Sequence, residues 1–143
     1  MFYEPKNNNP FKIDPFKSLI FPRPIGWISS ISKRGIANLA PYSYFNAVAD
    51  EPPQVMFCSN GSSAHAKYKD SLSNILSTKE FVVNFATSTT RNQMNKTSKD
   101  FKPDEDEFFL SNLKKKKSKL VKAPSVKNSP VNLECKFIKT IKL

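Results

Sequence analysis

The stretch that decides the fold runs from Phe21 to Asn60 and reads FPRPIGWISSISKRGIANLAPYSYFNAVADEPPQVMFCSN. Small polar residues interrupt its apolar, strand-like runs at positions that a buried sheet would normally avoid. These residues offer neutral hydrogen-bond donors and acceptors: Ser29, Ser30, Asn38, Ser43, Asn46, Ser59 and Asn60. Prolines fix turns between the runs, at positions 22, 24, 41, 52 and 53. The pattern indicates short strands whose polar side chains contact a ligand.

Three strands are expected in this stretch, at residues 25–31, 44–49 and 54–59. Lys33-Arg34-Gly35 supplies a hairpin turn after the first strand, because glycine adopts positive φ without a steric cost. Residues 38–41 are interpreted as a further turn, and the acidic and proline-containing residues 50–53 separate the second strand from the third. Short and closely spaced strands of this kind are typical of a small barrel.

Beyond residue 67 the apolar period changes from that of a strand to that of a helix. Tyr68, Leu72, Ile75 and Leu76 form one helical stripe. Asp70 either caps the start of this helix or lies in its first turn. Two more strands and a polar, helical segment complete the expected elements, at residues 81–85, 131–143 and 88–99 respectively.

The remaining two segments are expected to be irregular. Residues 1–20 contain Pro and Asn breaks, and we interpret them as an arm that packs on the body through its apolar side chains, Phe11, Phe16, Leu19 and Ile20. Residues 102–130 contain an acidic cluster at 104–107 and a lysine run at 114–117. Such charge blocks are typical of an exposed loop or a disordered segment.

The order of these features resembles the flavin reductase-like family of FMN-binding split barrels. The family pattern consists of an arginine-proline entry, a glycine-tryptophan strand, an asparagine-leucine-alanine-proline turn and a serine-tyrosine-phenylalanine-asparagine run. This chain matches it with Arg23-Pro24, Gly26-Trp27, residues 38–41 and residues 43–46. Lys69-Asp70-Ser71 and Glu80 to Asn84 continue the match, which is strong over residues 18–90 and weak elsewhere.

The resemblance implies a single, mainly β domain over residues 1–143, a split barrel with one or two helices, and FMN as its cofactor. In the family, the residues matched by Lys69, Asp70 and Ser71 lie near the FMN phosphate, where a helix start supplies N–H donors. Arg23 is expected either to approach the phosphate or to pair with a carboxylate. The full set of expected cofactor contacts is Arg23, Ser29, Ser30, Asn38, Ser43, Tyr44, Phe45, Ser59, Asn60, Lys69, Asp70 and Ser71.

Composition excludes several other classes of function. With only three glycines, at positions 26, 35 and 61, the chain contains neither a GxGxxG fingerprint nor a phosphate-binding P-loop. Cys58 and Cys135 are interpreted as small core residues of a protein in a reducing compartment, and His65 as a solvated loop residue rather than a metal ligand. We find neither a signal peptide nor an apolar run long enough to cross a membrane, so a cytoplasmic protein is expected.

The formal net charge of +11 raises the possibility of nucleic-acid binding. The excess is concentrated outside the matched stretch: residues 1–95 carry ten Lys/Arg and six Asp/Glu, whereas residues 96–143 carry thirteen and six. Only three of the 23 basic residues are arginine, the side chain best suited to bidentate phosphate contacts. We therefore expect no nucleic-acid partner.

The resemblance implies an NAD(P)H-dependent oxidoreductase that passes a hydride to FMN and then electrons to a small acceptor, such as free flavin, a ferric chelate or a partner oxygenase. It also implies a homodimer. No catalytic residue is assigned. Two alternatives stay open: an FMN-binding electron carrier without nicotinamide turnover, and a basic interaction protein or fragment without cofactor. Family members extend beyond the strand matched by Leu133 to Lys136, so the barrel is expected to be incomplete at its C-terminal end.

Overall fold

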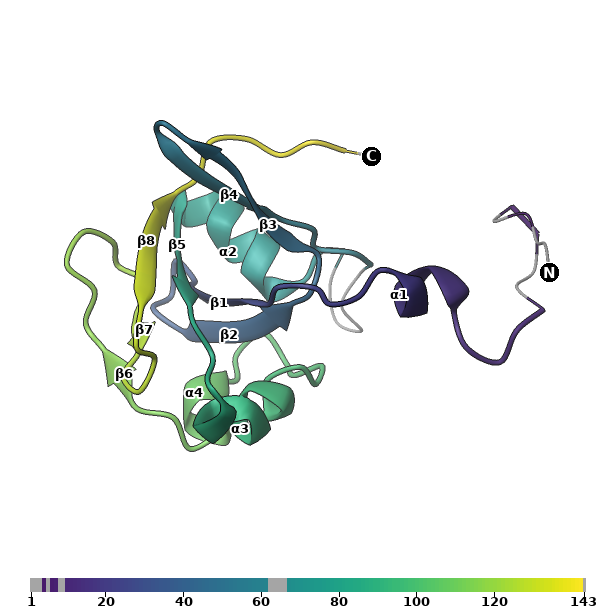
Figure 1. Cartoon of the computed structure of the whole chain (residues 1–143). Helices are drawn as coiled ribbons and strands as arrows, with labels where there is room; N and C mark the ends of the chain where they lie inside the picture. The colour runs from purple at the N-terminus through teal and green to yellow at the C-terminus, as the bar shows by residue number, and fades with distance from the viewer. Residues whose placement is uncertain (1–3, 5, 8–9, 62–66, 143) are drawn as a thin grey trace.

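A computed structural model of the chain describes residues 4, 6–7, 10–61 and 67–142. Its centre is a four-stranded antiparallel sheet with the order β2-β1-β5-β8 (Figure 1). The strands are β1 (Gly26–Ile31), β2 (Ala37–Tyr42), β5 (Glu80–Asn84) and β8 (Asn132–Lys136). The hairpin between β1 and β2 turns at Gly35, whose φ of 83° confirms the expected turn.

The turn predicted at residues 38–41 is wrong, because these residues belong to β2. A turn was expected because Pro41 cannot donate a backbone hydrogen bond to a neighbouring strand. Pro41 is accommodated because β2 is the edge strand of the four-stranded sheet. This placement brings Asn38 and Tyr42 to the same face of an edge strand, which matters for the site described below.

One face of the sheet is covered by a helix and a hairpin (Figure 1). The helix is α2 (Asp70–Thr78), and the hairpin consists of β3 (Phe45–Asp50) and β4 (Pro53–Phe57). These elements confirm the expected helix and the second and third expected strands to within two residues. Between the layers lies an apolar core, formed by Ile28, Tyr42, Ile75, Phe81 and Val83.

The opposite face is covered by the segments that follow β5. They contain a 3-10 turn, η1 (Ser88–Thr90), then α3 (Arg91–Lys96), α4 (Glu107–Leu110), β6 (Lys115–Lys116) and β7 (Ser125–Val126). A second core on this side consists of Trp27, Ala37, Leu39, Phe108 and Val126. The prediction that residues 102–130 form an exposed or disordered loop is wrong in part: the lysine run 114–117 is exposed, but Phe108 and Val126 are fully buried in this core.

The N-terminal arm contains one short helix, α1 (Pro15–Leu19), and extends away from the body (Figure 1). Its expected packing is wrong for three of the four named residues: Phe16, Leu19 and Ile20 are 58%, 79% and 48% exposed. At the other end of the chain, β8 ends at Lys136, so the strand expected over residues 131–143 is shorter than predicted. Ile138 and Ile141 beyond it are exposed.

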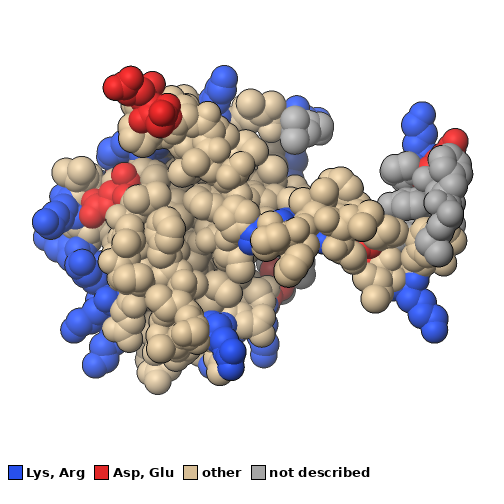
Figure 2. Space-filling view, in the orientation of Figure 1, with Lys and Arg blue, Asp and Glu red and all other residues tan. Residues whose placement is uncertain are grey.

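Charge is unevenly distributed over the surface. On the face shown in Figure 2, the centre is largely uncharged, and many Lys and Arg side chains gather at the margin beside β6 and β8. Among the described residues, no helix is long and apolar enough to cross a membrane, and no group of three or more His, Cys, Asp and Glu side chains is placed to hold a metal ion. His65 lies outside the described residues, and both cysteines are free and half-buried.

Candidate functional site

A cleft of about 240 Å³ opens at the edge strand β2. Its walls come from three directions: β2, the start of α2, and the chain from the end of α3 to α4. The lining residues are Asn38, Ala40, Pro41 and Tyr42; Lys69, Asp70 and Ser71; and Thr97, Ser98, Lys99, Asp100, Phe101 and Glu107. The cleft therefore brings together four residues that the sequence predicts as cofactor contacts: Asn38, Lys69, Asp70 and Ser71.

Asn38 is the centre of a buried hydrogen-bond network at the floor of this cleft. Its Oδ1 accepts from Ser71 Oγ at 2.7 Å and from Ser30 Oγ at 3.3 Å. Its Nδ2 donates to Glu107 Oε1 at 2.6 Å. Asn74 of α2 donates to Ser30 Oγ at 3.2 Å and ties the helix to β1. The network fixes the start of α2 against the sheet, so Ser30 and Asn38 act as supports of the cleft.

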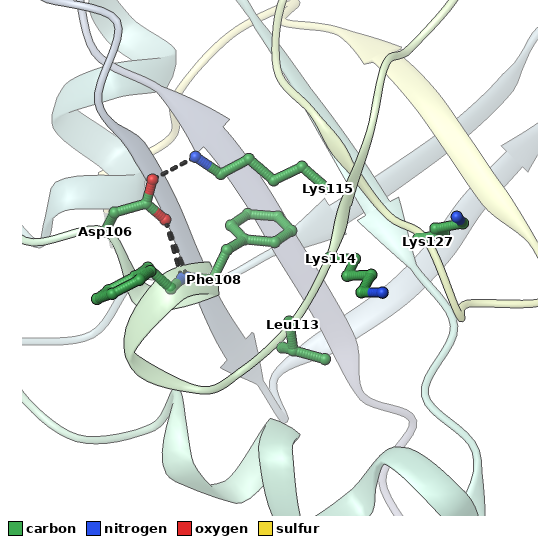
Figure 3. A pocket seen from close by; sticks show the side chains of 7 residues that line it. Asp106, Phe108, Leu113, Lys114, Lys115 and Lys127 are labelled. Atoms are coloured by element: carbon green, nitrogen blue, oxygen red, sulfur yellow. Dashed lines mark hydrogen bonds and ion pairs between the residues drawn. The ribbon is translucent and has the colours of Figure 1, made fainter.

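Glu107 is the buried acid of the cleft, and α4 holds it in place. Asp106 Oδ1 accepts from the N–H groups of Phe108 and Phe109, which caps the helix (Figure 3). Lys115 pairs with Asp106, and the Phe108 ring is fully buried. Glu107 Oε2 accepts from the N–H of Leu39 at 3.2 Å, on the outer side of edge strand β2. Burial raises the pKa of the Glu107 carboxyl to about 7, against the opposing effect of its hydrogen bonds.

The start of α2 is suited to an anion. Asp70 lies in the first turn, and among the described residues no side chain caps the helix at Lys69. The first N–H groups of a helix have no partner within the helix, and the helix dipole is positive at this end. Lys69 is exposed beside them and contributes a positive charge. Ser71 is 1% exposed, and its hydroxyl donates to Asn38 Oδ1. The lone pairs of Ser71 Oγ therefore stay available to accept a hydrogen bond from a ligand in the cleft.

Two buried hydroxyl groups are suited to a polar ligand. Tyr42 Oη and Ser59 Oγ are both buried, and neither has a hydrogen-bond partner in the described part of the chain. Burial raises the pKa of Tyr42; the neighbouring hydroxyls of Ser71 and Ser59 oppose the shift, although their contacts with Tyr42 fall short of hydrogen-bonding geometry. A buried hydroxyl without a partner costs about 1–3 kcal/mol. A polar ligand with several hydroxyl groups, such as the ribityl phosphate of FMN, would satisfy both.

The turn between β2 and β3 carries Ser43 and Tyr44, both half-buried. Arg23 lies over the Tyr44 ring, with its guanidinium carbon 5.5 Å from the ring centre. Its Nη1 donates to the carbonyls of Lys17 and Ile20 in the arm, and the expected approach of Arg23 to the phosphate stays a prediction. Its buried Nε has no partner among the described residues. Asn60, after β4, is exposed.

Phe45 and Ser29 lie away from the cleft. The Phe45 ring packs against the Gly26 backbone so closely that a Cβ at Gly26 would lie 2.5 Å from Phe45 Cδ2. Ser29 is on the opposite face of β1, where its Oγ donates to the Pro124 carbonyl at 2.6 Å and accepts from Asn84 Nδ2 at 3.0 Å. Both side chains therefore have structural contacts that account for their position. Trp27 is fully buried, and its Nε1 donates to Thr97 Oγ1.

Sequence reasoning missed Tyr42, Glu107 and the segment from Thr97 to Phe101. Glu107 was assigned to an exposed acidic cluster. The sequence does signal a helix start here, because the N-cap residue Asp106 is followed directly by Glu107 and the apolar run Phe108 to Leu110, but it does not signal that Glu107 lies in a cleft. No comparable signal marked the segment 97–101.

A second hollow, of about 660 Å³, lies beside α4 (Figure 3). Phe108, Phe109 and Leu113 form its apolar part, and Lys114, Lys115 and Lys127 lie at its rim. It is widely open to solvent, and Phe109 is 84% exposed. None of its lining residues carries one of the buried, unsatisfied atoms found in the described part of the chain, whereas Tyr42 lines the cleft at β2, which makes that cleft the better candidate for a cofactor site.

Residues 18–143 match the model of the flavin reductase like domain. The chain belongs to the flavin reductase-like family. Among its relatives is an uncharacterized protein of Aquifex aeolicus, 45% identical over 123 residues, an alignment that covers 86% of this chain and 62% of the relative. The chain spans about three fifths of the length of this relative and of a second one from Bacillus subtilis.

Solved structures agree with this assignment. Nitrilotriacetate monooxygenase component B from Bacillus cereus is 31% identical, with a TM-score of 0.89 over all of this chain and 70% of that one. A flavoredoxin from Methanosarcina acetivorans is 25% identical, with a TM-score of 0.73 over 96% of this chain and 64% of that one. The mainly β, flavin reductase-like split barrel predicted from the sequence is therefore confirmed. The family and its neighbours also support FMN as the cofactor.

Proposed function

We propose that this flavin reductase-like chain binds FMN in the cleft at β2 and uses it to transfer a hydride from NADH or NADPH, passing the electrons on to a small acceptor. The observation that carries the proposal is the pair of buried, unsatisfied hydroxyls of Tyr42 and Ser59 beside an uncapped helix start. Family membership supplies the chemical class of the ligand.

Different residues of the cleft would bind different parts of the cofactor. The N–H groups at the start of α2, together with Lys69, would hold the phosphate. Tyr42 and Ser59 would donate to ribityl hydroxyls, and Ser71 would accept from one of them, since its own proton is directed to Asn38. Ser43, Tyr44 and Asn60, which lie in the adjoining turns, stay predicted contacts of the ring edge or of the ribityl hydroxyls.

FMN, when bound, accepts the hydride at its isoalloxazine ring and releases electrons singly or in pairs. The chain's own contribution is to bind and orient the cofactor and to leave one ring face open to the nicotinamide. No side chain of the described cleft is assigned a role in breaking the C–H bond. Specificity for the acceptor would come from the surface around the cleft.

A homodimer fits the exposed apolar surface of the protomer. Phe21 in the arm is 83% exposed, and Val48 and Met56 of the β3–β4 hairpin are 52% and 51% exposed. Apolar surface of this kind is typically covered by a partner. We also propose a cytoplasmic location, where nicotinamide cofactors are available. Sedimentation of the purified chain at several concentrations tests the dimer: a monomer at all of them would refute it.

A second candidate is an electron carrier that holds FMN without turning over nicotinamide. The flavoredoxin from Methanosarcina acetivorans, at 25% identity, is the observation that favours it. Both candidates use the same cofactor site and differ in whether NAD(P)H reduces the bound flavin.

Anaerobic mixing of the FMN-loaded chain with NADH or NADPH separates the two candidates. The proposed reductase loses the visible absorbance of oxidised flavin on mixing, because hydride transfer reduces the cofactor. Lys69→Ala should weaken FMN binding about tenfold through loss of a charge-assisted contact, whereas Lys33→Ala, an equal change at the exposed β1–β2 turn, should not. Flavin that stays oxidised with both nicotinamides would contradict the reductase and favour the carrier.

A further inference from the structure

We propose that Glu107 is the proton-accepting group of the cofactor cleft, so that binding of FMN phosphate at the start of α2 is accompanied by partial protonation of the Glu107 carboxylate. The inference rests on the proposed FMN site. It adds a residue that neither the sequence motifs nor the family description assigns, and a chemical event that accompanies binding.

The position of Glu107 is the first observation. It lines the same cleft as Lys69 and Ser71, although it comes from α4 on the other side of β2. The residue is only 5% exposed. Its carboxylate touches the network that supports the helix start, since Asn38 donates to Glu107 and accepts from Ser71. A negative charge placed at the start of α2 would therefore raise the pKa of Glu107, because the two are joined by the buried hydrogen bonds from Ser71 to Asn38 and from Asn38 to Glu107.

The second observation is how the Glu107 charge is balanced. Its two oxygens accept one hydrogen bond each, from Asn38 Nδ2 at 2.6 Å and from Leu39 N at 3.2 Å. Both donors are neutral. Ion pairs join Lys17 to Asp14, Lys115 to Asp106 and Lys136 to Glu80, and none of these pairs includes Glu107. The carboxylate is thus a buried negative charge without a cationic partner in direct contact, which is costly.

The surrounding charges are of both signs. Asp70 faces Glu107 from α2 and raises its pKa further, after burial as the main cause. Lys69 lines the cleft from the same helix start, and Lys99 and Asp100 line it from the segment after α3. On its own element, the neighbouring Asp106 is paired with Lys115. From β2 come only the neutral donors of Asn38 and Leu39.

A phosphate dianion entering this cleft adds negative charge to a space that already holds Asp70 and Glu107. The group that can relieve the repulsion is Glu107, because its pKa of about 7 lies close to neutral pH. Protonation places the hydrogen on one oxygen and leaves the other as an acceptor for Asn38. The proton comes from the solvent, and the weaker bond to Leu39 is the one that protonation gives up.

The size of the effect follows from linkage. If FMN raises the Glu107 pKa by about one unit, binding takes up about half a proton at a pH of about 7.5, and the affinity falls about sixfold between pH values of about 6.5 and 8.5. The phosphate of FMN itself titrates near a pH of about 6. That contribution is the same in wild-type and variant protein, so a comparison between them removes it.

The experiment is a calorimetric titration of the full chain with FMN across this pH range, in two buffers with different ionisation enthalpies. The difference in observed heat between the buffers gives the protons taken up. Wild-type protein should show an uptake of about half a proton at neutral pH, and Glu107→Gln should lose it while binding FMN with little pH dependence. Glu105→Gln, the same charge change in the neighbouring acidic cluster but outside the cleft lining, should behave as wild type.

A second measurement does not depend on a variant that folds. The pKa of the Glu107 carboxyl can be followed by carbon NMR in wild-type protein, with and without FMN. A higher pKa in the FMN complex supports the inference. FMN binding with an unchanged Glu107 pKa, or with equal proton uptake in Glu107→Gln, overturns the inference alone. Absence of FMN binding at every pH overturns the proposed function, and the inference with it.

Discussion

Removal of the Tyr42 hydroxyl tests the reasoning that the cleft is built for a polar ligand. Without ligand, Tyr42 Oη is buried and has no partner among the described residues, so the folded protein bears its desolvation cost. The packing of the ring is kept after the change, because the centre of the Tyr42 ring lies 4.8 Å from that of the Phe57 ring in the core beneath α2. Tyr42→Phe therefore removes the desolvation cost of the buried hydroxyl and keeps the packing of the ring.

The expected result has two parts of opposite sign. Ligand-free Tyr42→Phe should be more stable than wild type by about 1 kcal/mol, the lower end of the cost of an unsatisfied buried hydroxyl. For a protein of this size that corresponds to a rise in Tm of about 2–4 °C. FMN affinity should fall by about 1–1.5 kcal/mol, or about five- to tenfold, because a hydrogen bond to the ligand is lost.

Urea denaturation of the ligand-free protein and titration of FMN fluorescence measure the two parts separately. Tyr68→Phe is the matched control, since Tyr68 is 43% exposed, does not line the cleft, and its hydroxyl is not among the buried, unsatisfied groups. A Tyr42→Phe protein that is less stable than wild type would show that the hydroxyl has a partner in solution. An unchanged FMN affinity would show that the hydroxyl does not face the cofactor.

Three further predictions follow from the same structure. Phe108→Ala should lower the free energy of unfolding by about 3–5 kcal/mol, because the ring is fully buried between β2 and β7. A free energy of unfolding within about 1 kcal/mol of wild type, measured in urea, would show that residues 102–130 do not pack as a core segment. The pKa of Glu107 is higher in the folded protein than in the unfolded chain, so Glu107 should lower the free energy of unfolding as the pH rises from about 4.5 to about 7, by up to about 3 kcal/mol. Glu107→Gln should remove this pH dependence in urea titrations. A variant whose stability depends on pH in the same way as wild type would refute the prediction. Simultaneous replacement of Lys114, Lys116 and Lys117 by Gln should leave FMN affinity within about twofold of wild type, since these exposed lysines lie outside the cleft; a loss of tenfold or more would place the anion site at the second hollow.

The strands could be predicted from the sequence because their signals are local. Alternation, Gly35 at the turn and the prolines at residues 52 and 53 give β1, β3 and β4 to within two residues. Pro41 misled the same reasoning at β2. Whether a proline ends a strand or lies on the free edge of one depends on the strand order in the sheet, which a single sequence does not contain.

The segment 102–130 shows a different limit. Its charge blocks dominate the composition, and exposure was inferred from them. The buried positions, Phe108 and Val126 among them, are separated by lysines and turns, so no periodic pattern marks them. What buries these residues is the uncovered face of the sheet around Trp27 and Leu39, a property of the assembled fold.

The candidate site was predictable in part. Family motifs identified Asn38 and Lys69 to Ser71, and the structure brings them to one cleft, with Ser71 and Asn38 in direct contact across 33 residues of sequence. Ser29 and Phe45 come from the same motifs but have structural contacts elsewhere. Glu107 could not be assigned from its neighbours in the sequence, because its role depends on reaching around the edge of β2.

The central claim is that this chain holds FMN in the cleft at β2. The most direct test is the visible absorption spectrum of the purified chain after incubation with FMN and removal of free ligand by gel filtration. Retained FMN in a ratio of about one per protomer, and its loss from Lys69→Ala but not from Lys33→Ala, is the predicted result. A well-folded chain that elutes without flavin would contradict the claim and would favour the interaction protein over the flavoprotein.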